Sequence, residues 1–190
     1  MCIRDRLEPD KRVGQANALK VNLPYSGDSF GVPDNLHILA TMNTADRSIA
    51  LLDTALRRRF TFQELMPDPE LLDKATEASA VDLVALLNTL NDRIEYLYDR
   101  EHQIGHAYFM QCRSRSDVDS AFRDRVIPLL NEYFYEDWEK VAQVLGDPNG
   151  ELFLERQKLP PPPGLESFDE ERWRWSVRSE FASDAYKGLT

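Results

Sequence analysis

The sequence predicts an α/β segment, then an α-helical domain, then an irregular tail. Near the N-terminus, the nearly continuous apolar run Leu36–Thr41 has the length of one strand and suits a strand buried on both faces. Further along, apolar residues recur at the 3.6-residue spacing of amphipathic helices. Beyond Asp147, a run of prolines at 160–163 interrupts any regular pattern. The predicted class is therefore α/β plus α.

Composition limits the kinds of protein this can be. Among its 190 residues, 42% are hydrophobic and 10% aromatic, which is ordinary for a globular protein. The net charge of -10 argues against this chain holding a nucleic-acid duplex by itself, because that requires a basic face. The two cysteines are far apart and predict neither a metal site nor a disulfide framework. This use of cysteine favours a reducing cytoplasm, and with no apolar stretch of membrane-spanning length we expect no membrane contact.

The first sixty-six residues divide into a short start and a core segment. Residues 1–6 join awkwardly to the rest and resemble translated sequencing adapter, so we expect them to be foreign or disordered, the alternative being a native, frayed terminus. Residues 7–66 form the predicted α/β segment. Within it, the alternation at Ala18–Leu23 predicts a short edge strand or hairpin arm. After the buried strand, Thr44 can cap a helix whose last turn holds Arg57–Arg59, and Phe60–Leu65 alternates like a second strand.

A domain boundary is expected at Pro67, and residues 67–146 are expected to form a helical bundle. Asp68 can cap a new element that has Pro69 at its first position, and Gly146 can end the final helix. A bend or restart is expected at Pro128. The apolar positions at helical spacing are Val84, Leu87, Leu90, Ile94 and Leu97, then Val118, Phe122, Val126, Leu129, Leu130 and Phe134. Residues 147–190 are expected to be a proline-rich linker and an aromatic tail, which either docks on the body or contacts another chain.

Three features could serve phosphate chemistry, and each has a plainer interpretation. The amide of Asn43, at the end of the predicted strand, could orient a water or a γ-phosphate, or merely cap the next helix. The arginines at 57–59 suit phosphate recognition, or a solvated helix end. His106, in the short non-helical segment Ile104–Phe109, is more often structural than catalytic. No phosphate-binding loop, no strand ending in adjacent acids and no metal-ligand spacing occurs.

Four segments together strongly resemble the McrB family, the AAA+ GTPase subunits of modification-dependent restriction endonucleases. The resemblance runs from about Leu7 to about Gly146. It implies that residues 7–66 are the last strands of an AAA+ P-loop NTPase core and that 67–146 are its helical lid. The four segments are Met42–Ser48, Leu52–Phe60, Ile104–Phe109 and Ile127–Phe134.

The resemblance also implies roles for single residues. Asn43 would occupy the sensor-1 position, and Arg58 and Arg59 would act in trans on the nucleotide of a neighbouring subunit. Asp46 and Arg47 would belong to the signature loop, and His106 would lie in the lid. Asp46, Arg47 and His106 are thus the expected cofactor-binding residues, and no metal ligand is assigned.

The implied cofactor is GTP, or ATP, with Mg²⁺, held only in a full-length protein. The implied partners are other copies in a homo-oligomeric ring, expected to be a hexamer, an McrC-like nuclease subunit, and DNA reached through parts absent here. Because the Walker A and Walker B elements are missing, we expect this chain to be the C-terminal part of a longer protein and inactive alone. Two alternatives stay open. The chain could belong to another AAA+ ATPase that remodels protein, or it could be a non-enzymatic helical interaction module.

Overall fold

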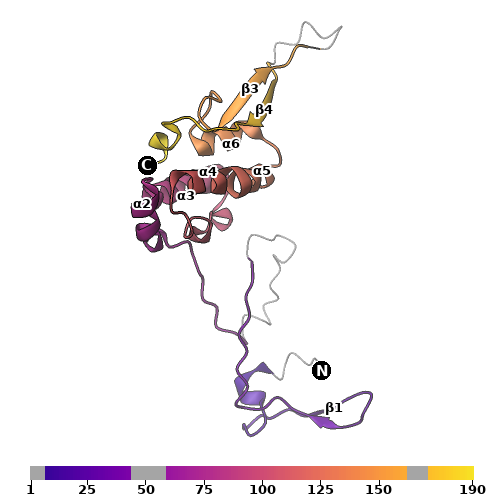
Figure 1. Ribbon diagram of the computed structural model, residues 1–190. Helices are drawn as coiled ribbons and strands as arrows, with labels where there is room; N and C mark the ends of the chain where they lie inside the picture. Colours follow the sequence, from indigo (N-terminus) through magenta and orange to yellow (C-terminus); the bar gives the residue numbers. More distant parts are fainter. Residues whose placement is uncertain (1–6, 44–58, 162–170) are drawn as a thin grey trace. The chain divides into compact units, whose positions relative to one another are not determined.

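The computed structural model describes residues 7–43, 59–161 and 171–190 (Figure 1). Its contacts divide the chain into two units, Met1–Leu65 and Met66–Thr190. Each unit is described by itself below. In the described part of the chain, no helix is long and apolar enough to cross a membrane.

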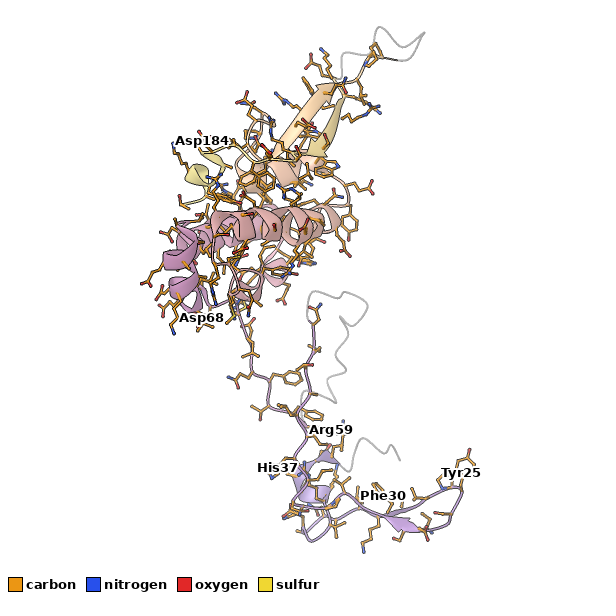
Figure 2. All side chains as sticks on the ribbon, viewed as in Figure 1. Tyr25, Phe30, His37, Arg59, Asp68 and Asp184 are labelled. Carbon is orange, nitrogen blue, oxygen red and sulfur yellow. The ribbon has the colours of Figure 1, made fainter. Side chains whose placement is uncertain are left out.

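The N-terminal unit is built on turns and one small hairpin. A 3-10 helix spans Pro9–Lys11, and β1 (Val21–Asn22) pairs antiparallel with β2 (Ser29–Phe30). The hairpin arm expected from the alternation at 18–23 is thus confirmed, although its paired part is only two residues long. Tyr25, in the connection between the strands and labelled in Figure 2, is fully exposed.

Two strands expected in this unit are absent from the structure. Leu36–Thr41 and Phe60–Leu65 have no regular secondary structure, so both predictions are wrong here. Leu39 is 97% exposed, and Val32 is the single buried hydrophobic residue among residues 7–43 and 59–65. A strand buried on both faces needs neighbouring strands and covering elements, and no described segment pairs with either run. The helix expected between them lies outside the described residues, apart from Arg59.

The C-terminal unit contains five α-helices and one hairpin among its described residues. Two 3-10 turns separate α3 from α4, a π-helical turn joins α4 to α5, and the hairpin follows α6 (Figure 1). The elements are α2 (Asp73–Ser79), α3 (Leu83–Leu97), α4 (Arg115–Ala121), α5 (Ile127–Tyr133), α6 (Trp138–Leu145), β3 (Leu154–Lys158) and β4 (Trp173–Val177).

The start of this unit confirms the expected cap. The carboxylate of Asp68 accepts a hydrogen bond from the backbone N–H of Glu70, and Pro69 is the first residue of a 3-10 turn, Pro69–Leu72. Pro is favoured there because it lacks an N–H at a position that has no intrahelical partner. The second helix in this region, α3, is capped in the same way by Asp82, whose carboxylate accepts from the N–H of Ala85 at 2.9 Å.

Helix α3 provides much of the core. Its buried side chains recur at helical spacing along one face, which contacts α2 and α6. Fully burying one leucine contributes about 1.5–3 kcal/mol, so this face is a main source of stability. The apolar side chains of α3 that are completely buried are Leu83, Leu86, Leu87, Leu90 and Ile94. Of the positions expected on this face, Val84 and Leu97 are only partly buried and pack against the core from its margin.

Where a bend or restart was expected at Pro128, a π-helical turn precedes it and α5 restarts at Ile127. Residues Phe122–Val126 form this turn between α4 and α5, and the N–H of Ile127 bonds to the carbonyl of Phe122. Pro128 has no N–H to donate, and its ring would clash with the carbonyl four residues earlier. The wider π turn accommodates it without breaking the helix.

The tail differs from the irregular linker that the sequence suggests. Leu154–Lys158 and Trp173–Val177 pair antiparallel, with Arg156 opposite Trp175. Residues on both sides of the hairpin enter the core of the helical unit, among them Phe153, Ala185, Tyr186 and Leu189. Trp175, Phe181 and Tyr186 of the tail pack in or against this core, so docking on the body is confirmed for them, whereas Phe168 lies outside the described residues.

One buried carboxylate connects α6 to this hairpin. Gly146 ends α6 with φ at 70°, and Asp147 follows it, 2% exposed. Oδ1 of Asp147 accepts from the N–H of Glu151, and Oδ2 accepts from the N–H groups of residues 152, 153 and 154, at 2.7 to 3.1 Å. This carboxylate therefore closes the turn that leads into β3.

Candidate functional site

The N-terminal unit places one expected site residue at a small cavity. Arg59 is 7% exposed at its side chain, and its Nη2 lies 3.0 Å from a carboxylate oxygen of Glu8. The cavity has a volume of about 270 Å³, and Arg12 and His37 also line it. Figure 2 labels Arg59 and His37 on this unit. Arg59 is thus held by an ion pair within its own chain.

Arg12 braces the same cavity by binding backbone carbonyls. Its Nη1 donates to the carbonyl of Leu36 at 2.8 Å and to that of Asp34 at 3.3 Å. These bonds hold the start of the apolar run that was expected to be a strand. Arg12 has no motif around it, and its role depends on residues more than twenty positions away, so the sequence offered no signal for it.

The other expected residues of the N-terminal unit are not gathered at this cavity. Asn43 is exposed and is not among the residues that line it. Asp46, Arg47 and Arg58 lie outside the described residues. The described part of this unit therefore does not bring an amide and the arginines together around one ligand.

His106 lies in the helical unit, in a segment that is firmly attached to its neighbours. Its Nδ1 accepts a hydrogen bond from the backbone N–H of Asp68 at 3.0 Å. Because Nδ1 is the acceptor, the neutral ring carries its proton on Nε2. This contact joins the segment Ile104–Phe109 to the first turn of the unit, which is what a structural histidine does. The expected role of His106 toward a nucleotide is a separate matter and stays a prediction.

Asn91 anchors the same segment, and sequence reasoning missed it. Its Oδ1 accepts from the N–H of Ile104 at 2.7 Å, and its Nδ2 donates to the carbonyl of Ile104 at 3.0 Å. Asn91 is 7% exposed, in the middle of the buried face of α3. A buried polar residue at an otherwise apolar helical position was the signal that could have found it.

A buried histidine and a carboxylate form a second polar pair near α3. The Nδ1 atom of His102 lies 2.6 Å from Oδ1 of Asp99, and the ring of His102 meets the rings of Tyr98 and Tyr133 edge to face. Although desolvation acts the other way, the bond and the charge of His102 and two backbone N–H groups hold the pKa of Asp99 below its ordinary value. Burial raises the pKa of Tyr133 to about 12. Because the ring of His102 packs against Tyr98 and Tyr133, the His102–Asp99 pair belongs to the packed interior of the helical unit.

The described residues contain no group of three or more His, Cys, Asp or Glu side chains that could hold a metal ion. They therefore do not fit Mg²⁺ at a site of their own. Cys112 is buried, and desolvation raises the pKa of its thiol, which makes it a poor nucleophile.

Comparison with known proteins identifies the helical unit. Residues 82–142 match the family model of the McrB α-helical lid domain, a stretch that runs from the N-cap of α3 into α6. The chain is also 37% identical to the EcoKMcrB subunit of the type IV methyl-directed restriction enzyme of Escherichia coli strain K12. That match covers 74% of this chain, which spans about a third (35%) of the length of that relative. The family expected from the four motifs is confirmed, and this chain belongs to the McrB family.

Proposed function

We propose that this chain forms part of the AAA+ motor subunit of a restriction system directed at modified DNA. The observation that carries the proposal is the McrB lid domain at 82–142, together with the 37% identity to a restriction subunit. In this proposal, residues 7–66 are the last part of the AAA+ core. The exposure of Leu39 and Leu65, at 97% and 85%, supports this, because strands of a larger sheet would bury such side chains.

Within the proposed motor, this chain supplies two kinds of polar group. Asn43 would orient the attacking water, and Arg58 and Arg59 would face the phosphates bound by a neighbouring subunit in a ring. Asp46, Arg47 and His106 would be the residues that contact the bound nucleotide. Bound GTP, or ATP, with Mg²⁺ would supply the reacting phosphate, and its cradle and metal ligands would come from sequence outside this chain. An McrC-like nuclease and DNA complete the proposed assembly.

A chimera tests this proposal directly. Residues 7–190 would replace the matching stretch of the E. coli EcoKMcrB subunit, and hydrolysis of GTP and ATP would be measured beside residues 7–190 alone. We expect hydrolysis by the chimera and none by the isolated chain. Asn43→Ala in the chimera should lower turnover on the order of 10²-fold at saturating nucleotide, because a water-orienting group acts mainly in the transition state.

The arginines need a mixing experiment. Arg58→Ala or Arg59→Ala should lower turnover roughly 10³–10⁵-fold if the arginine acts as a finger. Mixing either variant with a chimera whose phosphate-binding loop is disabled should restore part of the activity, since some interfaces then pair an intact loop with intact arginines. If chimeras form rings and bind nucleotide but the mixtures gain nothing, the trans assignment is wrong.

A second candidate function, a non-enzymatic interaction module, is favoured by one observation. The helical unit has a complete core of its own, whereas the N-terminal unit buries only Val32 among its described hydrophobic residues. If the chimera forms rings and binds nucleotide but does not hydrolyse it, the interaction-module hypothesis replaces the proposed motor function.

A further inference from the structure

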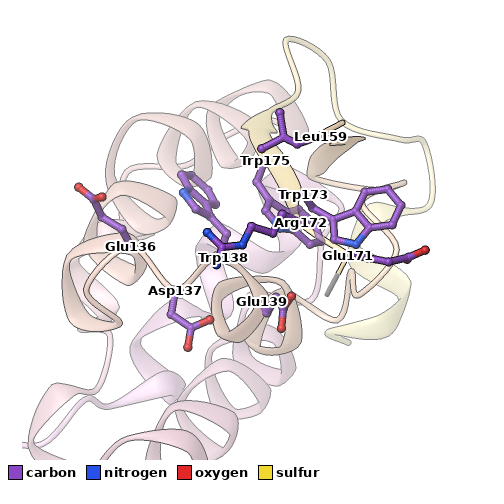
Figure 3. Close-up of a pocket in the computed structure, with 9 residues that line it drawn as sticks. All are labelled: Glu136, Asp137, Trp138, Glu139, Leu159, Glu171, Arg172, Trp173 and Trp175. Atoms are coloured by element: carbon purple, nitrogen blue, oxygen red, sulfur yellow. The ribbon is translucent and has the colours of Figure 1, made fainter. Parts of the chain in front are cut away.

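All three tryptophans of the chain line one cavity in the helical unit. Trp138 lies at the start of α6, and Trp173 and Trp175 lie on β4. The cavity has a volume of about 330 Å³, and Figure 3 shows the three indole rings around it. No catalytic motif involves this place, and the proposed motor function does not use it.

The edge of β4 that faces away from β3 pairs with no other described strand. The N–H of Leu159 bonds to the carbonyl of Arg172, and the N–H of Arg178 bonds to the carbonyl of Phe153. Because hydrogen-bonded and non-bonded pairs alternate in an antiparallel ladder, the backbone groups of Trp173 and Trp175 point away from β3. The described sheet has two strands only, so no third strand covers them. Such an edge can accept another extended segment.

Carboxylates around the cavity favour a cation. Four acidic side chains line it, against one guanidinium, that of Arg172. Asp137 is engaged with Lys140, and Glu171 lies 2.5 Å from Lys158. Over the described part of the chain, the other two carboxylates, those of Glu136 and Glu139, have no ion pair and are exposed. The net charge of -10 argues against nucleic acid as the occupant, because nucleic-acid binding needs a basic face.

The tryptophan rings already accept a guanidinium from one side. The Cζ atom of Arg156 lies 4.4 Å from the ring centroid of Trp173 and 5.8 Å from that of Trp175. Indole is the side chain over which a cation is held best. The parts of the rings that line the cavity offer the same attraction to an incoming Arg or Lys.

We propose that the outer edge of β4 and this cavity bind an extended basic segment of a partner protein. The segment pairs with the backbone of Trp173 and Trp175 as an added strand. One of its Arg or Lys side chains enters the cavity, where the indole rings contact its cation and Glu136 and Glu139 balance its charge.

The test uses the 190-residue chain and a synthetic peptide that contains no Trp or Tyr. The probe is acetyl-Thr-Arg-Val-Arg-Val-Arg-Thr-amide, and the readout is the intrinsic tryptophan emission, which comes only from this site. We expect a saturable change with Kd below about 1 mM. The same peptide with Glu in place of Arg should give none, because its charge matches that of the cavity.

Two sets of matched molecules separate charge from backbone pairing. The double variant Glu136→Gln with Glu139→Gln should bind the Arg peptide about three- to tenfold more weakly, as expected for two exposed charge pairs. The control, Glu70→Gln with Glu77→Gln, changes charge equally at exposed positions of the same unit that do not line the cavity. Peptides N-methylated on one or the other alternating set of amides should differ, since only one set faces β4.

Four results would overturn the proposal. The first is no saturable change with the Arg peptide, and the second is equal binding of the Glu peptide. The third is that the site and control double variants lose equal affinity for the Arg peptide, or that both N-methylated peptides bind as well as the unmethylated one. The fourth is a different occupant. A dimer in sizing experiments that Glu136→Gln with Glu139→Gln dissociates would identify a second copy, and an emission change with oligothymidylate would identify nucleic acid.

Discussion

Replacing Asp147 with Asn should destabilise the helical unit more than any isosteric change on its surface. The carboxylate is 2% exposed and accepts four backbone N–H bonds, one at Oδ1 and three at Oδ2. In Asp147→Asn, the better orientation keeps a neutral oxygen toward the three donors and turns the NH₂ toward the N–H of Glu151. Bonds to a charged acceptor contribute about 1.5–3 kcal/mol each and neutral ones about 0.5–1.5 kcal/mol. Because the buried charge also carries a desolvation cost that Asn avoids, we expect a net loss of about 2–4 kcal/mol.

Urea unfolding of the whole chain measures this loss. Tryptophan emission and circular dichroism at 222 nm both report on the helical unit, since all three tryptophans belong to it. Asp184→Asn is the control, because Asp184 is exposed and makes no capping bond with its side chain. Hydrogen exchange should show the amides of Phe153 and Leu154 losing protection first. A change in unfolding free energy within about 0.5 kcal/mol of the control would refute the role given to this carboxylate.

Three further predictions concern the same unit. Burial raises the pKa of Tyr133 to about 12, so the neutral phenol contributes its full share of the unfolding free energy below pH 10, and this share is lost as pH rises through 12. Urea titrations between pH 10 and 12 should therefore show a smaller fall in unfolding free energy for Tyr133→Phe than for the wild type. Asn91→Ala should lower the unfolding free energy by about 1–3 kcal/mol, because the N–H and the carbonyl of Ile104 both lose their hydrogen-bond partner. The amide of Ile104 should then become open to hydrogen exchange. Unchanged exchange there would contradict that role. Arg93 donates to the carbonyls of Val144 and of residue 188, so Arg93→Met should lower the thermal midpoint and loosen the C-terminal turn, whereas an unchanged midpoint would show that these bonds contribute nothing.

Local patterns determined the helical part of this protein. Asp68 before Pro69, the apolar spacing of α3 and Gly146 after α6 act over one or two turns, and each holds in the structure. The McrB family was equally readable, because its motifs are short and contiguous. Helix formation satisfies backbone groups within the segment itself, so nearby residues suffice to specify it.

Pairing across distance was decided only by tertiary structure. The sequence predicted an aromatic tail but no strand in it, because the partner strand of Trp173 and Trp175 lies across a proline-containing connection. The cavity also needs Trp138 from α6. Asp147 and Asn91 act through backbone groups that a pattern of side chains does not reveal.

The same reason explains the failed strands. Leu36–Thr41 has the composition of a buried strand, yet a strand exists only when other strands accept its backbone bonds and other side chains cover its faces. The sequence by itself determined the helices, their caps and the family. The tertiary structure decided which extended segments pair, which polar groups become buried and where the tryptophans meet, because those contacts depend on residues far apart along the chain.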